Sequence, residues 1–547
     1  MDDLLLAKFD LEQFQWKSFH TDDGAEAHIR LLAGGECTHD IMNRHVQGDQ
    51  TLFFAVYVDL ASAYERAKII DTCRDAWKWL RYYLPIIACT ISVDDDDTGR
   101  LEYHSPTPSG VDEWVARTFI VHDQQVLDLN ELRTQVGQTR IPSAAGDQTW
   151  LHFVANASVA DDAITRVGFL FQSHHAPFDG PGIKLVFSRY LTRVASSLGS
   201  SMPCDFVWGS EVHNLTPCVY NILSALEPCP IPPHSGEQPS FDKPYYQSMQ
   251  AIYSDVLKAS QQNAYGFRPR PRDTRWPLCQ REEIVLSKRE SDMILERLKD
   301  ALPSQRSYTI THLIHAALVM VVMSDNPPEK NGLESFLNNY SLVNCRSRLK
   351  EPYSQPTHEG YPGYAIGITM MRIPVSIFCS SSGELLPLNR DLLFKAMDAI
   401  RDFYDNQRAV PAPLSCMAQL GQIMSVTMKD AAVANLLPPN QCYMLSSDGV
   451  GERYLQPTYA DQSGNTVLTV PKFFSSLNRN DPGPFFRVSS WKGVIELSAD
   501  FNSNLVSKQE VRHHLTKWRE LILLITRDAE GLGNSAFSSS TGRVGIP

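Results

Sequence analysis

His174 and His175 are adjacent, and Asp179 and Gly180 follow them within the stretch QSHHAPFDGPG. An imidazole whose pKa lies near ~6.5 can take the proton from a hydroxyl or amine as it attacks a carbonyl carbon, so this pair could supply a general base at neutral pH. The same residues also have a structural interpretation, because Asp179 is a favourable N-cap and the proline after Gly180 suits a first helical turn. The elements predicted on either side of the pair help to distinguish the catalytic interpretation from the structural one.

The elements on either side of the pair are a buried strand and a helix. Residues 165–175 contain the run Val-Gly-Phe-Leu-Phe, which is apolar on both faces as in a central strand. Beyond the Asp-Gly-Pro-Gly segment, apolar residues recur at spacings of three and four through residues 183–198, and this spacing predicts a helix. A histidine at the rigid end of a central strand can be aimed reliably, which favours the catalytic interpretation.

A second histidine pair, His513 and His514, provides a comparison within the same chain. It lies inside a predicted helix whose N-terminus carries a capping box formed by Ser507 and Glu510. No strand end and no Asp-Gly accompany this pair, so we expect both histidines to lie on the helix surface without a chemical role.

Several other catalytic signatures are missing from the sequence. It contains no Gly-x-Ser-x-Gly elbow of an α/β-hydrolase, no His-Glu-x-x-His, no P-loop and no Gly-x-Gly-x-x-Gly after a strand. Four adjacent aspartates occupy residues 94–97, but neighbours along a chain cannot all face one ion, so we interpret them as a solvated hairpin turn. No metal site is expected.

The composition is typical of a large soluble protein. The chain has 547 residues, of which 43% are hydrophobic and 20% charged, and its formal net charge of -12 opposes binding to nucleic acid. Eleven cysteines occur singly, which is typical of a reducing compartment. The longest apolar stretch, residues 313–323, is too short to span a bilayer, and the N-terminus lacks a secretory signal. We therefore expect a cytoplasmic monomer without membrane or nucleic-acid partners.

A proline-rich stretch divides the chain into two regions with predicted strands and helices. Residues 1–225 predict alternating strands and helices, residues 226–280 are rich in proline and predict an inter-domain connection, and regular elements resume through residues 281–535. Residues 536–547 are rich in Ser and Gly and are expected to be disordered. The pattern predicts an α/β protein with two domains.

The segment HHAPFDG resembles the His-His-x-x-x-Asp-Gly signature of the CoA-dependent acyltransferase superfamily, which includes chloramphenicol acetyltransferase, peptide-synthetase condensation domains and plant BAHD acyltransferases. Three further segments resemble the superfamily in the same order, namely residues 307–323, which predict a buried helix, residues 342–353 with the sequence LVNCRSRLKEPY, and residues 445–455 with LSSDGVGERYL. The resemblance covers nearly the whole chain and is closest to fungal acetyltransferases of the trichothecene 15-O-acetyltransferase type.

The resemblance implies a fold and a catalytic residue. The fold would be two lobes like chloramphenicol acetyltransferase, each a mixed sheet with flanking helices, arranged in a V with a tunnel between them. His175 matches the general base, whose Nε2 would face the tunnel, take the acceptor's proton during attack on an acyl thioester, and return a proton to the leaving thiolate.

The resemblance also implies residues that support the site. Asp179 would point away from the substrate and pair with the arginine of an Asn-x-Arg segment, which Asn344 and Arg346 match by their spacing. Arg348 is a close competitor for this pairing. His174 and Gly180 would be structural as well, Gly180 by giving the backbone room to turn.

The resemblance does not assign the group that stabilises the oxyanion or the role of four arginines. The Asp-Phe-Gly-Trp-Gly motif of the plant enzymes is missing, and residues 489–504 stand in its place, so the donor that stabilises the oxyanion is unassigned beyond a serine or threonine of the second lobe. Four arginines in the connection could grip the phosphates of coenzyme A, or could simply belong to a solvated segment. They are Arg268, Arg270, Arg272 and Arg275.

The expected function is an O-acyltransferase that uses acetyl-CoA, or another acyl-CoA, as co-substrate and esterifies a hydroxyl of a secondary metabolite such as a terpenoid. Two alternatives stay open. The donor could be an acyl group on a carrier protein, as in condensation-type enzymes, or the same fold could serve as a binding scaffold without catalysis.

Overall fold

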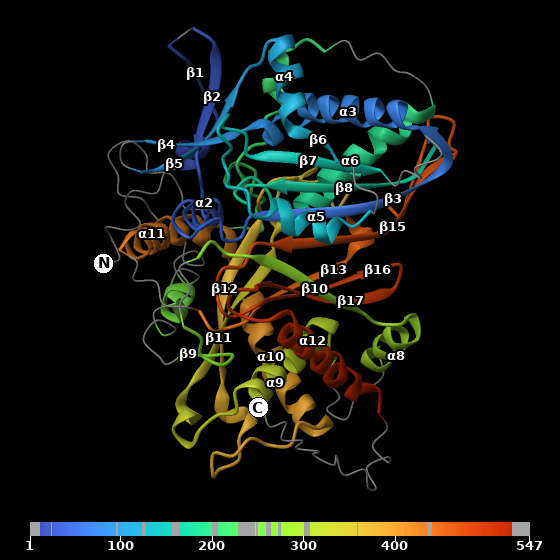
Figure 1. The fold of residues 1–547 in the computed structure, drawn as a ribbon. Coiled ribbons are helices and arrows are strands. Elements are labelled where there is room, and N and C mark those ends of the chain that lie inside the picture. Colours follow the sequence, from blue (N-terminus) through green and yellow to red (C-terminus); the bar gives the residue numbers. More distant parts are fainter. Residues whose placement is uncertain are drawn as a thin grey trace, which may run out of the picture.

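The structure is a computed structural model of the chain. It describes residues 11–527 except 23, 95–96, 123–126, 156–162, 200–205, 228–246, 248–249, 257, 259–263, 272–274, 300–306, 358, 411 and 435–439. The described elements form two halves, each built on a sheet covered by helices (Figure 1). Parallel and antiparallel pairs mix within the sheets, which confirms the predicted α/β class.

The first half is built on a six-stranded sheet of order β14-β15-β3-β8-β7-β6. Its central strands β3 and β8 are apolar on both faces, because helices α3, α4 and α6 pack on one face and α5 packs on the other. The elements are β3 (Leu52–Glu65), β6 (Phe119–His122), β7 (Thr149–Ala155), β8 (Ala163–Ser173), β14 (Thr458–Ala460), β15 (Thr466–Leu477), α3 (Arg66–Tyr83), α4 (Pro108–Thr118), α5 (Leu129–Val136) and α6 (Gly180–Gly199).

A smaller antiparallel sheet of order β1-β2-β5-β4 lies beside helix α2 in the same half (Figure 1). Its bounds are β1 (Lys17–His20), β2 (Glu26–Leu31), β4 (Thr90–Val93) and β5 (Gly99–His104), and α2 spans Gly35–His45.

The second half contains a four-stranded sheet of order β10-β17-β16-β13 and a three-stranded sheet of order β12-β11-β9. Helices α8, α9, α10 and α12 share one core with these strands, and α9 is buried from His312 to Met323, as its predominantly apolar sequence predicts. The strands are β9 (Ala264–Tyr265), β10 (Cys279–Val285), β11 (Phe336–Asn344), β12 (Ile366–Pro374), β13 (Met444–Val450), β16 (Phe485–Trp491) and β17 (Val494–Asn502). The helices are α8 (Lys288–Lys299), α9 (Ile310–Asp325), α10 (Arg390–Arg408), α11 (Pro413–Val433) and α12 (Lys508–Ile522).

Short 3-10 helices connect many of these elements. They are η1 (Leu11–Phe14), η2 (Pro85–Ala88), η3 (Ser210–Asn214), η4 (Val219–Asn221), η5 (Lys330–Glu334), η6 (Arg346–Arg348), η7 (Val375–Phe378), η8 (Gly451–Arg453) and η9 (Leu523–Thr526). No helix in the described part of the chain is long and apolar enough to cross a membrane.

One segment of the C-terminal sequence belongs to the first half. Strand β15 pairs antiparallel with β3, and β14 pairs with β15, so these two strands extend the first sheet although they follow most of the second half in the chain. The lobe division at residues 225 and 281 stays a prediction, but these strands do not follow it. Part of the proline-rich connection, including residues 228–246, and the tail at 536–547 lie outside the described residues.

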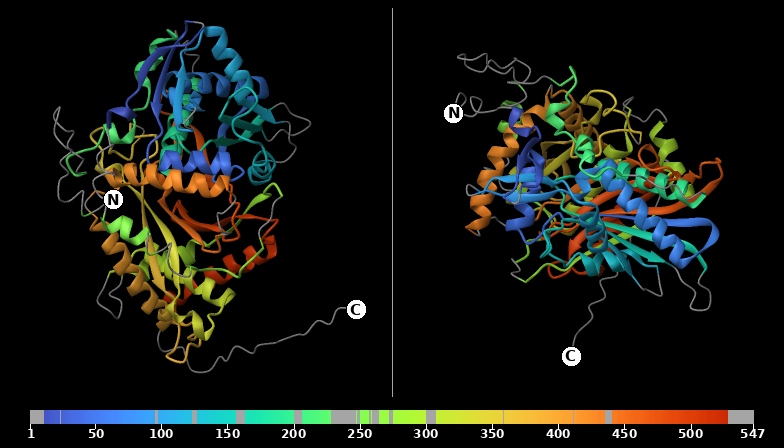
Figure 2. Two further views of the ribbon diagram at one scale, coloured as in Figure 1. Left: turned by 90° about the vertical axis from the view of Figure 1, so that its left-hand side faces the viewer. Right: turned by 90° about the horizontal axis from the view of Figure 1, so that it is seen from above.

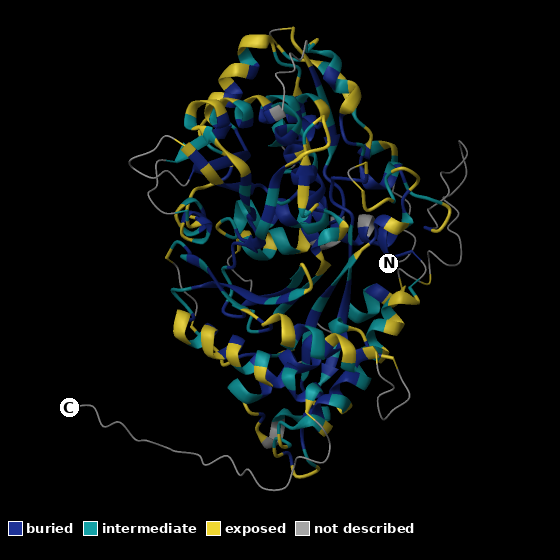
Figure 3. Cartoon of the chain, turned by 90° about the vertical axis from the view of Figure 1, so that its right-hand side faces the viewer, coloured by how far each residue is buried: buried dark blue, intermediate teal, exposed yellow. Residues whose placement is uncertain are grey.

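Helices α2 and α11 cross at the boundary between the halves (Figure 2). A Cβ on Gly421 of α11 would lie 2.5 Å from the Cα of Gly34, which precedes α2 and has φ +56, so no side chain fits at this crossing. The contact holds α2 against the second half. Buried residues concentrate on the sheets within each half, and the outer helices carry the exposed ones (Figure 3).

Candidate active site

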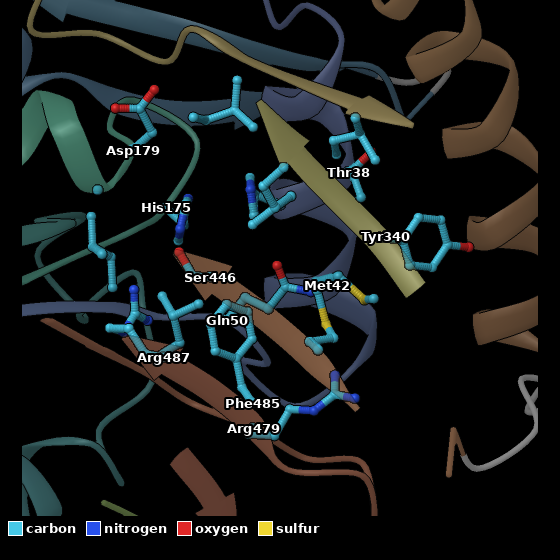
Figure 4. A pocket seen from close by; sticks show the side chains of 18 of the residues that line it. Thr38, Met42, Gln50, His175, Asp179, Tyr340, Ser446, Arg479, Phe485 and Arg487 are labelled. Carbon is cyan, nitrogen blue, oxygen red and sulfur yellow. The ribbon is translucent and has the colours of Figure 1, made fainter. Parts of the chain in front are cut away.

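His175 lies in the loop between β8 and α6, where the sequence predicts the end of a strand. Its half-buried side chain lines a cavity of about 640 Å³ whose walls come from both halves (Figure 4). The first half contributes α2 and the β8–α6 loop, and the second contributes β11, β12, β13, β16 and α11. A cavity of this size is typical of small-molecule sites and can hold more than one reacting group.

The imidazole of His175 is neutral at neutral pH. Burial lowers its pKa from 6.5 to about 4, an effect that its own backbone carbonyl and Asp179 oppose and that the charge of Arg487 reinforces. A neutral imidazole is the form that can accept a proton. Its Nδ1 is buried, which leaves Nε2 as the nitrogen available to the cavity.

His39 of α2 stacks directly on His175. The two ring centroids are 3.8 Å apart and the ring planes differ by 20°. Tyr364 meets both rings edge-on, at 5.3 Å from His39 and 6.1 Å from His175. Burial holds the pKa of His39 well below its ordinary value, so the ring that packs against the proposed base carries no charge. This stack fixes the orientation of the His175 ring.

His174 does not line the cavity, and its contacts shape the loop. Its side chain is 2% exposed, its Nδ1 accepts from the backbone N–H of Ala176 at 3.1 Å, and its own backbone N–H donates to the carbonyl of Gln148 at 2.9 Å. Burial lowers the pKa of this imidazole to about 3. These contacts fit the structural role that the sequence analysis expects.

Asp179 is buried and lies between the start of α6 and Arg346. Its Oδ1 accepts from Nη2 of Arg346 at 2.7 Å and from the backbone N–H of Gly182 at 2.7 Å, and its Oδ2 accepts from Nη1 of Arg346 at 3.0 Å. The backbone N–H of Ala365 also donates to Oδ2 at 2.8 Å. Asp179 is therefore both a helix cap and one side of a bidentate ion pair.

Every N–H of the Arg346 side chain is used. Besides Asp179, the guanidinium donates to Oδ1 of Asn344 at 3.2 Å and to the carbonyls of Tyr361 at 2.8 Å and Gly363 at 2.6 Å. The competing Arg348 lies elsewhere and pairs with Glu227 at 2.8 Å. The Asn-x-Arg segment of β11 and η6 thus joins the second half to the loop that carries His175.

The role expected of Gly180 falls to Gly182 instead. A Cβ on Gly180 would meet nothing within 4 Å, so its turn does not need a glycine. A Cβ on Gly182 would lie 2.2 Å from the carbonyl oxygen of Pro362 and 2.9 Å from Nη2 of Arg346. Glycine is required where α6 approaches the second half, two residues later than the sequence analysis expects.

Polar residues of the second half form the wall opposite His39. Ser446 of β13 and Arg487 of β16 are cross-strand partners, and in Figure 4 both lie beside His175. Asp448 accepts from the Ser446 hydroxyl at 2.6 Å and from Nζ of Lys184 at 3.1 Å, and its Oδ1 lies 3.3 Å from Nη1 of Arg487. These two cations hold the pKa of Asp448 well below its usual range despite burial.

The family model of 15-O-acetyltransferase Tri3 matches residues 9–362, which is more than half of the chain. The chain belongs to the Tri3 family. It is 24% identical over 465 residues to a trichothecene 15-O-acetyltransferase of Fusarium sporotrichioides, covering 81% of this chain and 83% of that protein. It is 21% identical to a trichothecene O-acetyltransferase of Trichoderma arundinaceum, covering 82% and 84%. As a Tri3 family member the protein is an acyltransferase.

Solved structures agree with the fold of the Tri3 family. The structure of the Fusarium sporotrichioides enzyme superposes with a TM-score of 0.78 at 19% identity, over 95% of this chain and 99% of that one. The starter condensation domain of rhizomide synthetase, solved with C8-CoA and Leu-SNAC, superposes with a TM-score of 0.53 at 12% identity, over 92% and 95%. The second likeness concerns the fold alone.

The three described arginines of the connection do not line the cavity of this Tri3 family chain. Arg268 donates to the backbone carbonyl of Asp325 at 2.6 Å, and Arg270 pairs with Glu510 at 2.6 Å. Arg275 is exposed, and Arg272 lies outside the described residues. None of the three described arginines lines the cavity, which favours the interpretation as a solvated segment over a grip on coenzyme A.

The surface prediction for the second histidine pair is wrong for His514. His513 is exposed, but His514 is 5% exposed and its Nε2 lies 3.2 Å from Oδ1 of Asp325. It follows Val511 by three residues and precedes Trp518 by four, so it falls on the apolar face of α12. No group of three or more His, Cys, Asp or Glu in the described ranges is placed to hold a metal ion.

Three residues that complete the site around His175 could not be found from the sequence. His39, Ser446 and Arg487 come from α2, β13 and β16, and only the fold brings them to one cavity. The segment around Ser446 is one of those that resemble the superfamily, but nothing in its letters singles out this serine. No sequence signal distinguishes His39 from the other histidines of the chain, or Arg487 from its other arginines.

Proposed function

We propose that the protein transfers the acetyl group of acetyl-CoA to a hydroxyl of a terpenoid secondary metabolite, with His175 as the general base. The observation that carries this proposal is the neutral His175 imidazole, stacked at 3.8 Å on His39 at the wall of a cavity shared by both halves. Membership of the Tri3 family and the acetyltransferase names of its relatives support the reaction class.

The transfer needs a single proton carrier. Nε2 of His175 takes the proton of the acceptor hydroxyl while the hydroxyl oxygen attacks the thioester carbonyl carbon, and the carbonyl electron pair moves to oxygen. The tetrahedral intermediate then collapses, the carbon–sulfur bond breaks, and the coenzyme A thiolate takes the proton back from the imidazolium. The products are an ester and free coenzyme A, and His175 returns to its neutral form.

The walls of the cavity away from His175 support an apolar acceptor. Met42 of α2, Met417 of α11 and Ile368 of β12 line this part, and Tyr340 of β11 adds an aromatic ring. Flexible methionine side chains adapt to the irregular outline of a polycyclic ligand. The relatives from Fusarium and Trichoderma are named for trichothecenes, so we propose an acceptor of that terpenoid class.

Two observations disfavour the alternatives. Carrier proteins are acidic, and a net charge of -12 opposes their approach, so free acetyl-CoA is the proposed donor. A binding scaffold without catalysis does not require a neutral histidine at the cavity wall, nor a buried Asp179–Arg346 pair that holds the loop of this histidine in place.

We expect the purified protein to convert hydroxylated sesquiterpenoids to esters heavier by one acetyl group when it is incubated with acetyl-CoA. Mass spectrometry of a panel of hydroxylated acceptors, each beside an analogue with hydrogen in place of the hydroxyl, checks this. Only the hydroxylated member of each pair should react. Turnover only with an acyl group on a carrier protein would show that acetyl-CoA is not the donor. If no thioester gives a product, the alternative of a binding scaffold without catalysis would be favoured.

A further inference from the structure

Arg487 is a buried cation beside the proposed base. It is 6% exposed, it lies on β16 next to Ser446 of β13, and it lines the same cavity as His175 (Figure 4). Its guanidinium lies over the ring of Phe485, with the guanidinium carbon 5.0 Å from the ring centroid. The side chain is therefore fixed at the cavity wall.

The hydrogen-bond donors of Arg487 are mostly unused. Its Nη1 lies 3.3 Å from Oδ1 of Asp448, and its Nη2 lies 3.7 Å from Oδ2 of Asp500, which is beyond hydrogen-bond distance. Nε and Nη2 are buried and have no hydrogen-bond partner among the residues that the structure describes. Buried donors without acceptors are costly, and Arg346 in the same protein uses all of its own.

The neighbouring carboxylates already accept hydrogen bonds from other donors. Asp448 accepts from Lys184 at 3.1 Å and from the Ser446 hydroxyl at 2.6 Å. Asp500 accepts from the Ser476 hydroxyl at 2.5 Å and from the backbone N–H of Leu477 at 2.9 Å. These two carboxylates therefore do not use all of the guanidinium of Arg487, and the side chain lines the cavity that a substrate would enter.

Ser446 is less suited to that task than Arg487. Its hydroxyl proton is directed to Asp448, so donating to a substrate oxygen would require breaking a short hydrogen bond to a carboxylate. A guanidinium keeps its positive charge at all relevant pH values and needs no rearrangement, which is the property expected of a group that stabilises a developing negative charge.

We infer that Arg487 is a catalytic residue that donates to the thioester carbonyl oxygen and stabilises the oxyanion of the tetrahedral intermediate. This inference rests on the proposed acetyl transfer. As the acceptor oxygen bonds to the carbonyl carbon, the displaced electron pair becomes an oxyanion that the positive charge of the Arg487 guanidinium stabilises, while the acceptor proton is on His175. When the carbon–sulfur bond breaks, the carbonyl re-forms and the thiolate takes that proton.

The test compares Arg487→Ala with the wild type and with Arg372→Ala. Arg372 also has a buried Nε and Nη2 without hydrogen-bond partners in the described ranges, but it packs on Phe336 and does not line the cavity. We expect Arg487→Ala to lower kcat by about 10²–10³-fold, because the interaction forms in the transition state, with little change in KM for acetyl-CoA. Arg372→Ala should keep the wild-type kcat.

Chemical rescue separates this role from a purely structural one. Millimolar guanidinium added to Arg487→Ala should restore part of its turnover, because the ion fits the space that the side chain leaves, whereas guanidinium should not raise the turnover of either control. All rates are normalised to the folded fraction measured by circular dichroism. A wild-type kcat in Arg487→Ala, or a loss that guanidinium fails to restore in the folded fraction, would overturn the inference. An inactive wild type would instead count against the proposed function.

Discussion

Replacing His175 by alanine is expected to lower kcat by about 10²–10⁴-fold while the protein stays folded, because this change removes the only group assigned to take the acceptor's proton. The ring is half-buried at the cavity wall and stacks on one neighbour, so its loss removes few packing contacts. Initial rates with acetyl-CoA and a hydroxylated acceptor, together with a thermal melt of each protein, measure both quantities.

His513 offers a matched control for this change. It is one member of the other His-His pair, and it is exposed on α12 and does not line the cavity. His513→Ala should leave kcat and the melting temperature unchanged, and turnover close to that of the wild type in His175→Ala would show that another group is the base.

Breaking the Asp179–Arg346 pair is expected to cost about 3–5 kcal/mol of the free energy of unfolding in either single variant, Asp179→Ala or Arg346→Met. Each change leaves an uncompensated charge at a site where the side chains are 1% and 3% exposed. If Asp179 were only a helix cap, its replacement would cost about 1 kcal/mol. Urea denaturation of the two singles and the double variant distinguishes these cases.

The double variant should lose clearly less than the sum of the two singles, because it removes both charges together. Arg74→Met is the control, since Arg74 and its partner Asp71 are 43% and 67% exposed and screening by water reduces the effect of its loss. Additive losses at Asp179 and Arg346 would mean that the bidentate pair carries no coupling.

The parts of the site that could be anticipated depend on local patterns. A strand apolar on both faces followed by an Asp-Gly helix start fixes where His175 and Asp179 lie, because strand and cap signals act over a few residues. The pairing with Arg346 has no local signal and came only from resemblance to a family. The choice between Gly180 and Gly182 failed because it depends on the distance to Pro362 of the other half.

The remaining features depend on contacts between distant segments. His39 precedes His175 by more than a hundred residues, and the position of α2 depends on its close contact with α11 at Gly421. Strand β15 carries the same alternation whether it pairs with β3 or with a strand of its own half, so periodicity could not assign it. Arg487 gains its significance from donors left unused, which only the packed structure reveals.

The mass of the intact protein distinguishes direct acetyl transfer between two bound substrates from transfer through an acetylated protein. The protein is incubated with acetyl-CoA alone and then with a hydroxylated sesquiterpenoid, while free thiol is monitored. We predict that the protein mass stays unchanged and no coenzyme A is released until the hydroxylated acceptor is added, after which thiol and acetyl ester form in equal amounts. An acetylated protein whose acetyl group then passes to the acceptor would contradict His175 as a general base in a single transfer step.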